Sequence, residues 1–211
     1  MTRRWKRWLV ALLVVVLIGG AFAAGELPYV PVVHGSTADE IDRMAAWLEV
    51  KPGMHLADVG AGDGTHAAAL AQRVGASGRV YANEISQGQL EVLRQKAAAL
   101  PSLSVVAGAV AQTNLPDACC DVIMSRFVYH HLADAPAINA DLARKLRPGG
   151  RLLIIDFEPG GLRAWLGMPP ETGHGTRKER VLKEVTAAGF ERLRGPERWR
   201  GRAYAVLFKR P

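Results

Sequence analysis

Apolar residues recur along this chain at two spacings, one typical of β-strands and the other typical of α-helices. The clearest unit lies at residues 55–74. A short apolar strand over residues 56–59 is followed by three closely spaced glycines and then by apolar positions at helical spacing. The helix is predicted to begin near Gly64, so its first backbone N–H groups point toward whatever occupies the turn. This unit predicts a ligand-binding turn between a strand and a helix.

The same spacings predict alternating helices and strands over the rest of the chain. Helices are expected from Thr37 to a point before Pro52 and over residues 86–100, 137–146 and 178–188. Strands are expected over residues 79–84, 103–107, 121–125, 151–156, 190–194 and 204–209. Ser86 and Gln89 have the spacing of a capping box at the start of one helix. The alternation predicts an α/β fold with a mostly parallel sheet, closed by an antiparallel pair of strands.

Length and charge permit one such domain. A chain of 211 residues with 49% hydrophobic content can bury a sizeable core and is not disordered. The net charge is +7, but four basic residues among the first seven leave an ordinary +3 for the rest. Basic residues gather between Arg192 and Arg202, where Glu191 and Glu197 are interspersed. We therefore predict a solvated face there and no nucleic-acid partner.

The N-terminus reads as a targeting element. The basic cluster precedes an uncharged apolar run, Leu9–Ala24, so residues 1–24 are a signal peptide or an N-terminal membrane anchor. Residues 25–36 form a linker, and residues 37–211 form the globular domain.

Cleavage and anchoring both stay open. Sixteen apolar residues fall short of the ~20 that span a bilayer, although Trp5 and Trp8 could extend the run as interfacial anchors. Residues 21–23 also satisfy the small-x-small rule for cleavage after Ala23. Both alternatives place the domain on the outer, periplasmic side, because the positive charges precede the run. A misassigned start or a reversed anchor would leave the domain in the cytosol.

The chemistry of the turn separates two classes of nucleotide ligand. The glycine spacing is GxGxG, whereas a dinucleotide turn has GxGxxG, and Thr65 stands where its third glycine belongs. Asp58 and Asp63 flank the turn and would repel a pyrophosphate. A cationic ligand suits these carboxylates better. Glu84 ends the next strand, where a carboxylate could accept hydrogen bonds from ribose hydroxyls.

Four stretches together resemble one known family. Residues 55–74 resemble motif I of the class I S-adenosylmethionine-dependent methyltransferases, and residues 108–132, 146–157 and 187–193 are similar to later parts of that family in the same order. The resemblance covers about residues 37–210. It implies a three-layer Rossmann-like methyltransferase fold with a seven-stranded sheet in the order 3-2-1-4-5-7-6. It also implies S-adenosylmethionine as cofactor.

The resemblance also implies roles for cofactor-binding residues. The methionine end of the cofactor would lie at Asp58 and at the turn that contains Gly60, Ala61, Gly62 and Gly64, with Glu84 on the ribose. The family usually has a carboxylate for the adenine amino group where this chain has Ala109. That departure leaves adenine recognition to backbone groups or to Gln112 and Asn114. Arg126, a charged residue at a strand end, is predicted from its position to bond the ligand's carboxylate or an acidic acceptor, or to form a surface salt bridge.

Candidate catalytic residues follow the fourth strand, where the family faces its acceptor. Tyr129 and His130 are the candidates there, with His130 as general base, and His131 is either packed or solvated. His174, in a later loop, could close over the acceptor site. No spacing predicts a metal site.

The sequence thus predicts a methyltransferase for a small-molecule acceptor, and its membrane-directed N-terminus favours a lipid-like one. Two alternatives stay open: an exported, non-catalytic binding protein on the same fold, which Ala109 favours, and a weaker one, a Rossmann-type NAD-dependent oxidoreductase. The sequence leaves the oligomeric state open.

Overall fold

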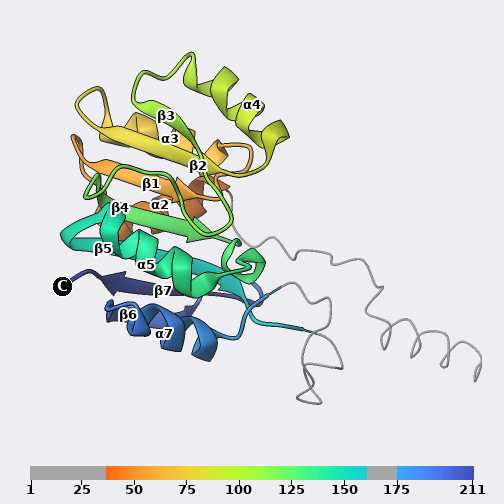
Figure 1. The fold of residues 1–211 in the computed structure, drawn as a ribbon. Coiled ribbons are helices and arrows are strands. Elements are labelled where there is room, and N and C mark those ends of the chain that lie inside the picture. Colours follow the sequence, from red (N-terminus) through yellow and green to blue (C-terminus); the bar gives the residue numbers. More distant parts are fainter. Residues whose placement is uncertain (1–36, 161–174) are drawn as a thin grey trace, which may run out of the picture. The chain divides into compact units, whose positions relative to one another are not determined.

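A seven-stranded sheet lies at the centre of the part of the chain that the structure describes, residues 37–160 and 175–211 (Figure 1). In this computed structural model the strand order is β3-β2-β1-β4-β5-β7-β6, and β7 runs antiparallel to both of its neighbours. The strands are β1 (His55–Val59), β2 (Arg79–Glu84), β3 (Leu103–Ala107), β4 (Cys120–Arg126), β5 (Leu146–Phe157), β6 (Glu191–Arg198) and β7 (Ala203–Lys209). The helices are α2 (Thr37–Leu48), α3 (Thr65–Val74), α4 (Gln87–Ala97), the short 3₁₀ helix η1 (Tyr129–His131), α5 (Ala135–Lys145) and α7 (Lys178–Ala187). This topology confirms the Rossmann-like fold that the resemblance implied.

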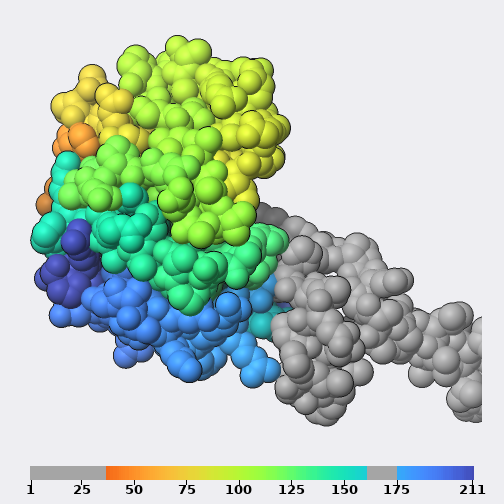
Figure 2. Space-filling model, in the orientation of Figure 1, coloured from red at the N-terminus to blue at the C-terminus, as the bar shows by residue number. Residues whose placement is uncertain are grey.

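Helices cover both faces of the sheet, which gives three layers. Met44 of α2, Leu70 of α3 and Leu93 of α4 belong to one hydrophobic cluster with residues from one face. Ile138 of α5 and Val181 of α7 belong to a second cluster on the opposite face. The space-filling view shows α5 and α7 side by side over that second face (Figure 2).

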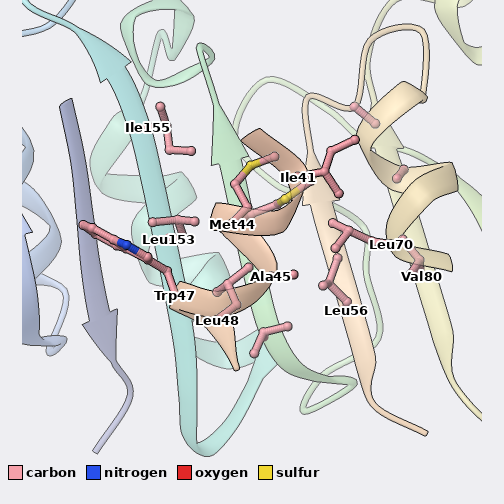
Figure 3. Close-up of a cluster of buried hydrophobic side chains, with 14 of the residues drawn as sticks. Ile41, Met44, Ala45, Trp47, Leu48, Leu56, Leu70, Val80, Leu153 and Ile155 are labelled. Carbon is pink, nitrogen blue, oxygen red and sulfur yellow. The ribbon is translucent and has the colours of Figure 1, made fainter. Parts of the chain in front are cut away.

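Helix α2 packs its apolar stripe against the middle of the sheet. Ile41, Met44 and Leu48 are buried there, as their helical spacing predicted (Figure 3). Trp47 extends the contact, because its ring meets that of Trp199 edge-on at 5.3 Å between centroids. The start of the domain is therefore tied to the hairpin near its end.

Several predicted element boundaries differ from the observed ones, among them the starts of α5 and β5. Helix α5 begins at Ala135 rather than at residue 137, because Asp134 caps it by accepting a hydrogen bond from the amide of Ala137 at 3.0 Å. Strand β5 begins at Leu146 rather than at residue 151, because Leu146 already pairs with Cys120 across a register shift.

The capping box predicted at Ser86 is wrong. Ser86 occupies the N-cap position of α4, but its side chain makes no capping hydrogen bond. The carboxylate of Glu84 accepts hydrogen bonds from the amides of Ile85 and Ser86 instead, at 2.7 and 3.0 Å. The chain leading into α4 is therefore held from the end of β2.

Some predictions concern residues that the structure does not describe. The apolar run Leu9–Ala24, the linker over residues 25–36 and His174 all lie outside the described residues, so their roles stay predictions. Among the helices of residues 37–160 and 175–211, none is long and apolar enough to cross a membrane.

The parallel register brings the predicted ligand-binding residues to one edge of the sheet. Asp58 of β1 lies opposite Met124 of β4, and Glu84 of β2 lies opposite Ala107 of β3. Arg126 ends β4 next to the glycine turn. These positions lie at the carboxyl ends of the strands, where open α/β sheets bind ligands.

Candidate functional site

A cavity of about 570 Å³ opens at this edge of the sheet. Its size is within the range of small-molecule and cofactor sites. The predicted cofactor residues in its lining are Asp58, Gly60, Ala61, Gly62, Glu84, Ala109 and Arg126. Residues that sequence reasoning did not assign also line it, among them His66, Ile85, Val110, Phe127 and Leu132. The structure thus brings together seven of the eight predicted cofactor residues.

The glycine turn shapes one wall of the cavity. The amides of Gly60 and Ala61 both donate to the carbonyl oxygen of Asn83 at 2.9 Å. Gly62 has φ +54°, and a Cβ there would meet no atom within 4 Å. Because Gly62 lines the cavity, that open space is available to a ligand.

Gly64 is the predicted cofactor residue that the structure places elsewhere. It does not line the cavity, and a Cβ there would lie 2.5 Å from Cδ2 of Leu93. Its φ is +76°. Gly64 therefore serves the close approach of α4 to the turn, which local sequence spacing could not distinguish from ligand contact.

The carboxylate of Glu84 anchors the turn as well as lining the cavity. In addition to the two amides at the start of α4, it accepts a hydrogen bond from the amide of Gly62 at 3.0 Å. A carboxylate offers about four acceptor positions, so these three bonds leave little capacity for a ligand. The two ribose hydrogen bonds that the sequence suggested stay a prediction, and the geometry accommodates one more readily than two.

Asp58 is a buried carboxyl group on the floor of the cavity. Its side chain lies among apolar strands, and burial is the main cause that raises its pKa from 3.8 to about 7, with the carboxylates of Glu84 and Asp63 acting in the same direction. Arg126 opposes the shift. A cationic ligand group beside Asp58 would favour its ionised form.

Arg126 forms an ion pair with Glu40, a partner that sequence reasoning did not name. Its Nε and Nη2 atoms donate to the two carboxylate oxygens of Glu40 on α2 at 2.9 and 3.0 Å. The same carboxylate accepts hydrogen bonds from Trp199 Nε1 at 2.9 Å and Arg200 Nη1 at 3.4 Å. Of the open alternatives for Arg126, a salt bridge is present, but it is partly buried and the residue still lines the cavity.

The cavity lining next to Glu84 offers mainly apolar and backbone groups. Ile85 and Val110 are exposed and line the cavity. Ala109 pairs with Gln112 in a short antiparallel bridge, with its amide donating at 2.8 Å. Gln112 lines the cavity, whereas Asn114 does not and donates to the carbonyl oxygen of Ala107 at 2.9 Å. Of the two amide side chains considered for adenine recognition, Gln112 is therefore the one in position.

The structure places Tyr129 away from the cavity. Its ring is 2% exposed, and its hydroxyl donates to Glu184 Oε2 and accepts from Asn139 Nδ2, both at 2.8 Å. These contacts belong to the α5/α7 face of the sheet. The turn of η1 thus directs Tyr129 into the core and away from the cavity at which a catalytic residue was expected.

The two histidines of η1 have different surroundings. His130 Nδ1 lies 2.7 Å from Oδ1 of the fully buried Asp156, and its amide donates to the other oxygen at 2.8 Å. His130 does not line the cavity, but His131 does, and the two rings lie 4.0 Å apart. His131, which the sequence interpretation left as packed or solvated, is the histidine of this pair at the cavity wall.

Comparisons with known proteins agree with this geometry. Residues 57–154 match the family model described as a methyltransferase domain. Nocamycin O-methyltransferase of Saccharothrix syringae is 33% identical over 154 residues, which are 72% of this chain and 54% of that protein. Malonyl-(acyl-carrier protein) O-methyltransferase of Serratia marcescens is 37% identical over 122 residues, 58% of this chain and 46% of that protein. The chain spans about half the length of these curated relatives.

A solved structure shows the same fold. The crystal structure of an S-adenosylmethionine-dependent methyltransferase from Aquifex aeolicus superposes with a TM-score of 0.69 at 23% identity, covering 81% of this chain and 89% of that one.

The raised pKa of Asp58 predicts a specific pH dependence of stability. The unfolded chain loses this proton near pH ~4, whereas the folded protein keeps it until pH ~7, so raising the pH across this interval favours unfolding. As the pH rises from ~4 to ~7, the unfolding free energy of the wild-type protein should fall by up to ~4 kcal/mol relative to that of Asp58→Asn. Above pH ~7 the difference between the two proteins should change little. Urea denaturation of both proteins across this range measures the difference.

Asp63→Asn is the matched control, because Asp63 lies in the same turn but its pKa is lowered by hydrogen bonds from Thr65 and by Lys96. Its difference from wild type should stay constant above pH ~5. A constant difference for Asp58→Asn as well would contradict the assignment.

Proposed function

We propose that the protein transfers a methyl group from S-adenosylmethionine to a small-molecule acceptor, because residues 57–154 match the methyltransferase-domain family model. One observation carries the proposal. The cavity at the carboxyl ends of β1, β2 and β4 combines a glycine turn that leaves room for a ligand with the buried carboxyl group of Asp58. That combination suits a cationic nucleoside ligand.

The chain's own groups would hold the cofactor by its charge and shape. The carboxyl group of Asp58 pairs with the amino group, Gly62 leaves space for close approach, and Glu84 offers its remaining acceptor position to a ribose hydroxyl. Ile85 and Val110 provide apolar surface beside this position. When bound, the cofactor would supply a methyl group on a sulfonium sulfur: an acceptor nucleophile would attack the methyl carbon in line with the S–CH₃ bond, and the thioether S-adenosylhomocysteine would leave.

An acceptor that is an alcohol, a phenol or an acidic carbon must also lose a proton. We assign this step to His131, because its ring lies at the cavity wall, and His130 supports it from behind through its 2.7 Å contact with Asp156. This modifies the prediction that His130 itself is the base. His174 keeps its predicted place near the acceptor only as a proposal.

A dinucleotide fits the cavity less well. Asp58 and Asp63 both line it and would repel a pyrophosphate, and Thr65 replaces the third glycine of the dinucleotide turn. A non-catalytic binding protein is the second candidate function. Ala109 supports it, since the family's adenine-binding carboxylate is missing at this position.

Transfer of a labelled methyl group tests the proposal. Full-length protein should transfer label from S-adenosylmethionine to at least one member of a panel of phenols, quinones and lipid extracts. His131→Ala should lower turnover on that acceptor by ~10²- to 10⁴-fold, the usual range for a positioned acid–base group, without changing cofactor affinity.

His55→Ala is the control, because His55 begins β1 at the opposite end of the sheet and should leave turnover unchanged. Binding of the cofactor with no transfer to any acceptor would favour the non-catalytic alternative. Full turnover of His131→Ala would show that alignment of the two substrates suffices.

The two glycines make a matched pair for the shape of the cavity. Gly62→Ala should cost ~1–2 kcal/mol of stability for its positive φ and weaken S-adenosylhomocysteine binding, because the new methyl group enters ligand space. Gly64→Ala should destabilise the protein more, since the new Cβ would clash with Leu93. The Gly64→Ala protein that does fold should bind S-adenosylhomocysteine with wild-type affinity. Calorimetric titration and urea denaturation of both variants measure these effects. Unchanged affinity of Gly62→Ala would mean that the turn is only structural.

A further inference from the structure

His66 presents a buried nitrogen that no described residue satisfies. It lies in the first turn of α3 and lines the same cavity as Asp58 and Arg126. Its side chain is 16% exposed, and its Nε2 atom is buried without a hydrogen-bond partner in the described part of the chain. An unpaired buried polar atom is unfavourable, so its presence at a cavity wall points to a ligand.

The neighbouring carboxylate of Glu40 has no capacity left for His66. Its Oε2 atom lies 4.0 Å from Nε2, beyond hydrogen-bond distance. The carboxylate already accepts two hydrogen bonds from Arg126 and one each from Trp199 and Arg200. These four donors occupy all the acceptor positions that a carboxylate offers.

The charges around His66 favour an anionic group. The guanidinium group of Arg126 lines the same cavity as His66 and, with that of Arg200, faces the carboxylate of Glu40, so an anionic ligand group would meet a cation here. Burial and the charge of Arg126 lower the pKa of His66, although Glu40 and Asp63 oppose them, which favours the neutral imidazole. In the tautomer that is protonated on Nε2, this imidazole offers one N–H donor to the cavity. Asp58, on the same floor of the cavity, supplies the complementary acidic group.

We propose that His66 binds the carboxylate at the amino-acid end of the cofactor, beside Arg126 and opposite the amino-binding carboxyl group of Asp58. The inference rests on the proposed function, since it assigns one end of the same ligand. It adds a contact that depends on the ligand's carboxylate and not on its nucleoside.

Two ligands that differ at this end test the assignment. S-adenosylhomocysteine carries the amino-acid end, whereas 5′-methylthioadenosine keeps the nucleoside and the thioether without it. In calorimetric titrations of the full chain, His66→Leu should weaken S-adenosylhomocysteine binding by ~10- to 100-fold, as expected for a lost hydrogen bond to a charged group. Its affinity for 5′-methylthioadenosine should stay within about twofold of wild type.

His66→Gln separates the donor from the shape of the ring, because its side-chain amide can donate from a position close to Nε2 and should restore most of the affinity. Gln72→Leu is the matched control, an exposed position on the same helix that should change neither affinity. Equal loss of both ligands in His66→Leu would overturn the inference. Wild-type protein that binds neither ligand would overturn the proposed function and the inference with it.

Discussion

The hydrogen bonds that backbone amides donate to the last two residues of β2 are the constraint on which the rest of the site depends. The carbonyl oxygen of Asn83 accepts the amides of Gly60 and Ala61, and the carboxylate of Glu84 accepts those of Gly62, Ile85 and Ser86. Two adjacent residues, Asn83 and Glu84, thus fix five backbone amides. Three of these amides lie in the connection after β1 and two in the connection after β2. They hold the glycine turn open over the sheet and set the start of α4, so the cavity is preformed in the fold.

Much of the fold could be predicted from the sequence, because the patterns that specify its helices, strands and turns are local. Short apolar strands, helical stripes and glycine turns follow from neighbouring residues, and their alternation leaves few topologies. The same locality explains why the sequence could place Asp58, Gly60 and Gly62 together at the cavity, since they belong to one unbroken motif. The strand order itself came from the resemblance and not from periodicity.

What the sequence missed depends on long-range contact or on direction. Glu40 and Arg126 are 86 residues apart in the sequence, so the residues around either one could not predict their ion pair. Spacing also cannot tell which way a residue points. Gly64 faces Leu93 and Tyr129 faces Glu184, although both lie in segments that line the cavity. His66 could have been noted from its place one residue after the turn, but only the structure shows its unpaired nitrogen.

The account's central claim is that this cavity recognises a nucleoside with a charged amino-acid end and not a pyrophosphate. Calorimetric titration of the full chain with S-adenosylmethionine, S-adenosylhomocysteine and NAD⁺ tests it most directly. The account predicts saturable one-to-one binding of both sulfur-containing ligands and no heat of binding with NAD⁺. Binding of NAD⁺ with no binding of S-adenosylhomocysteine would contradict it.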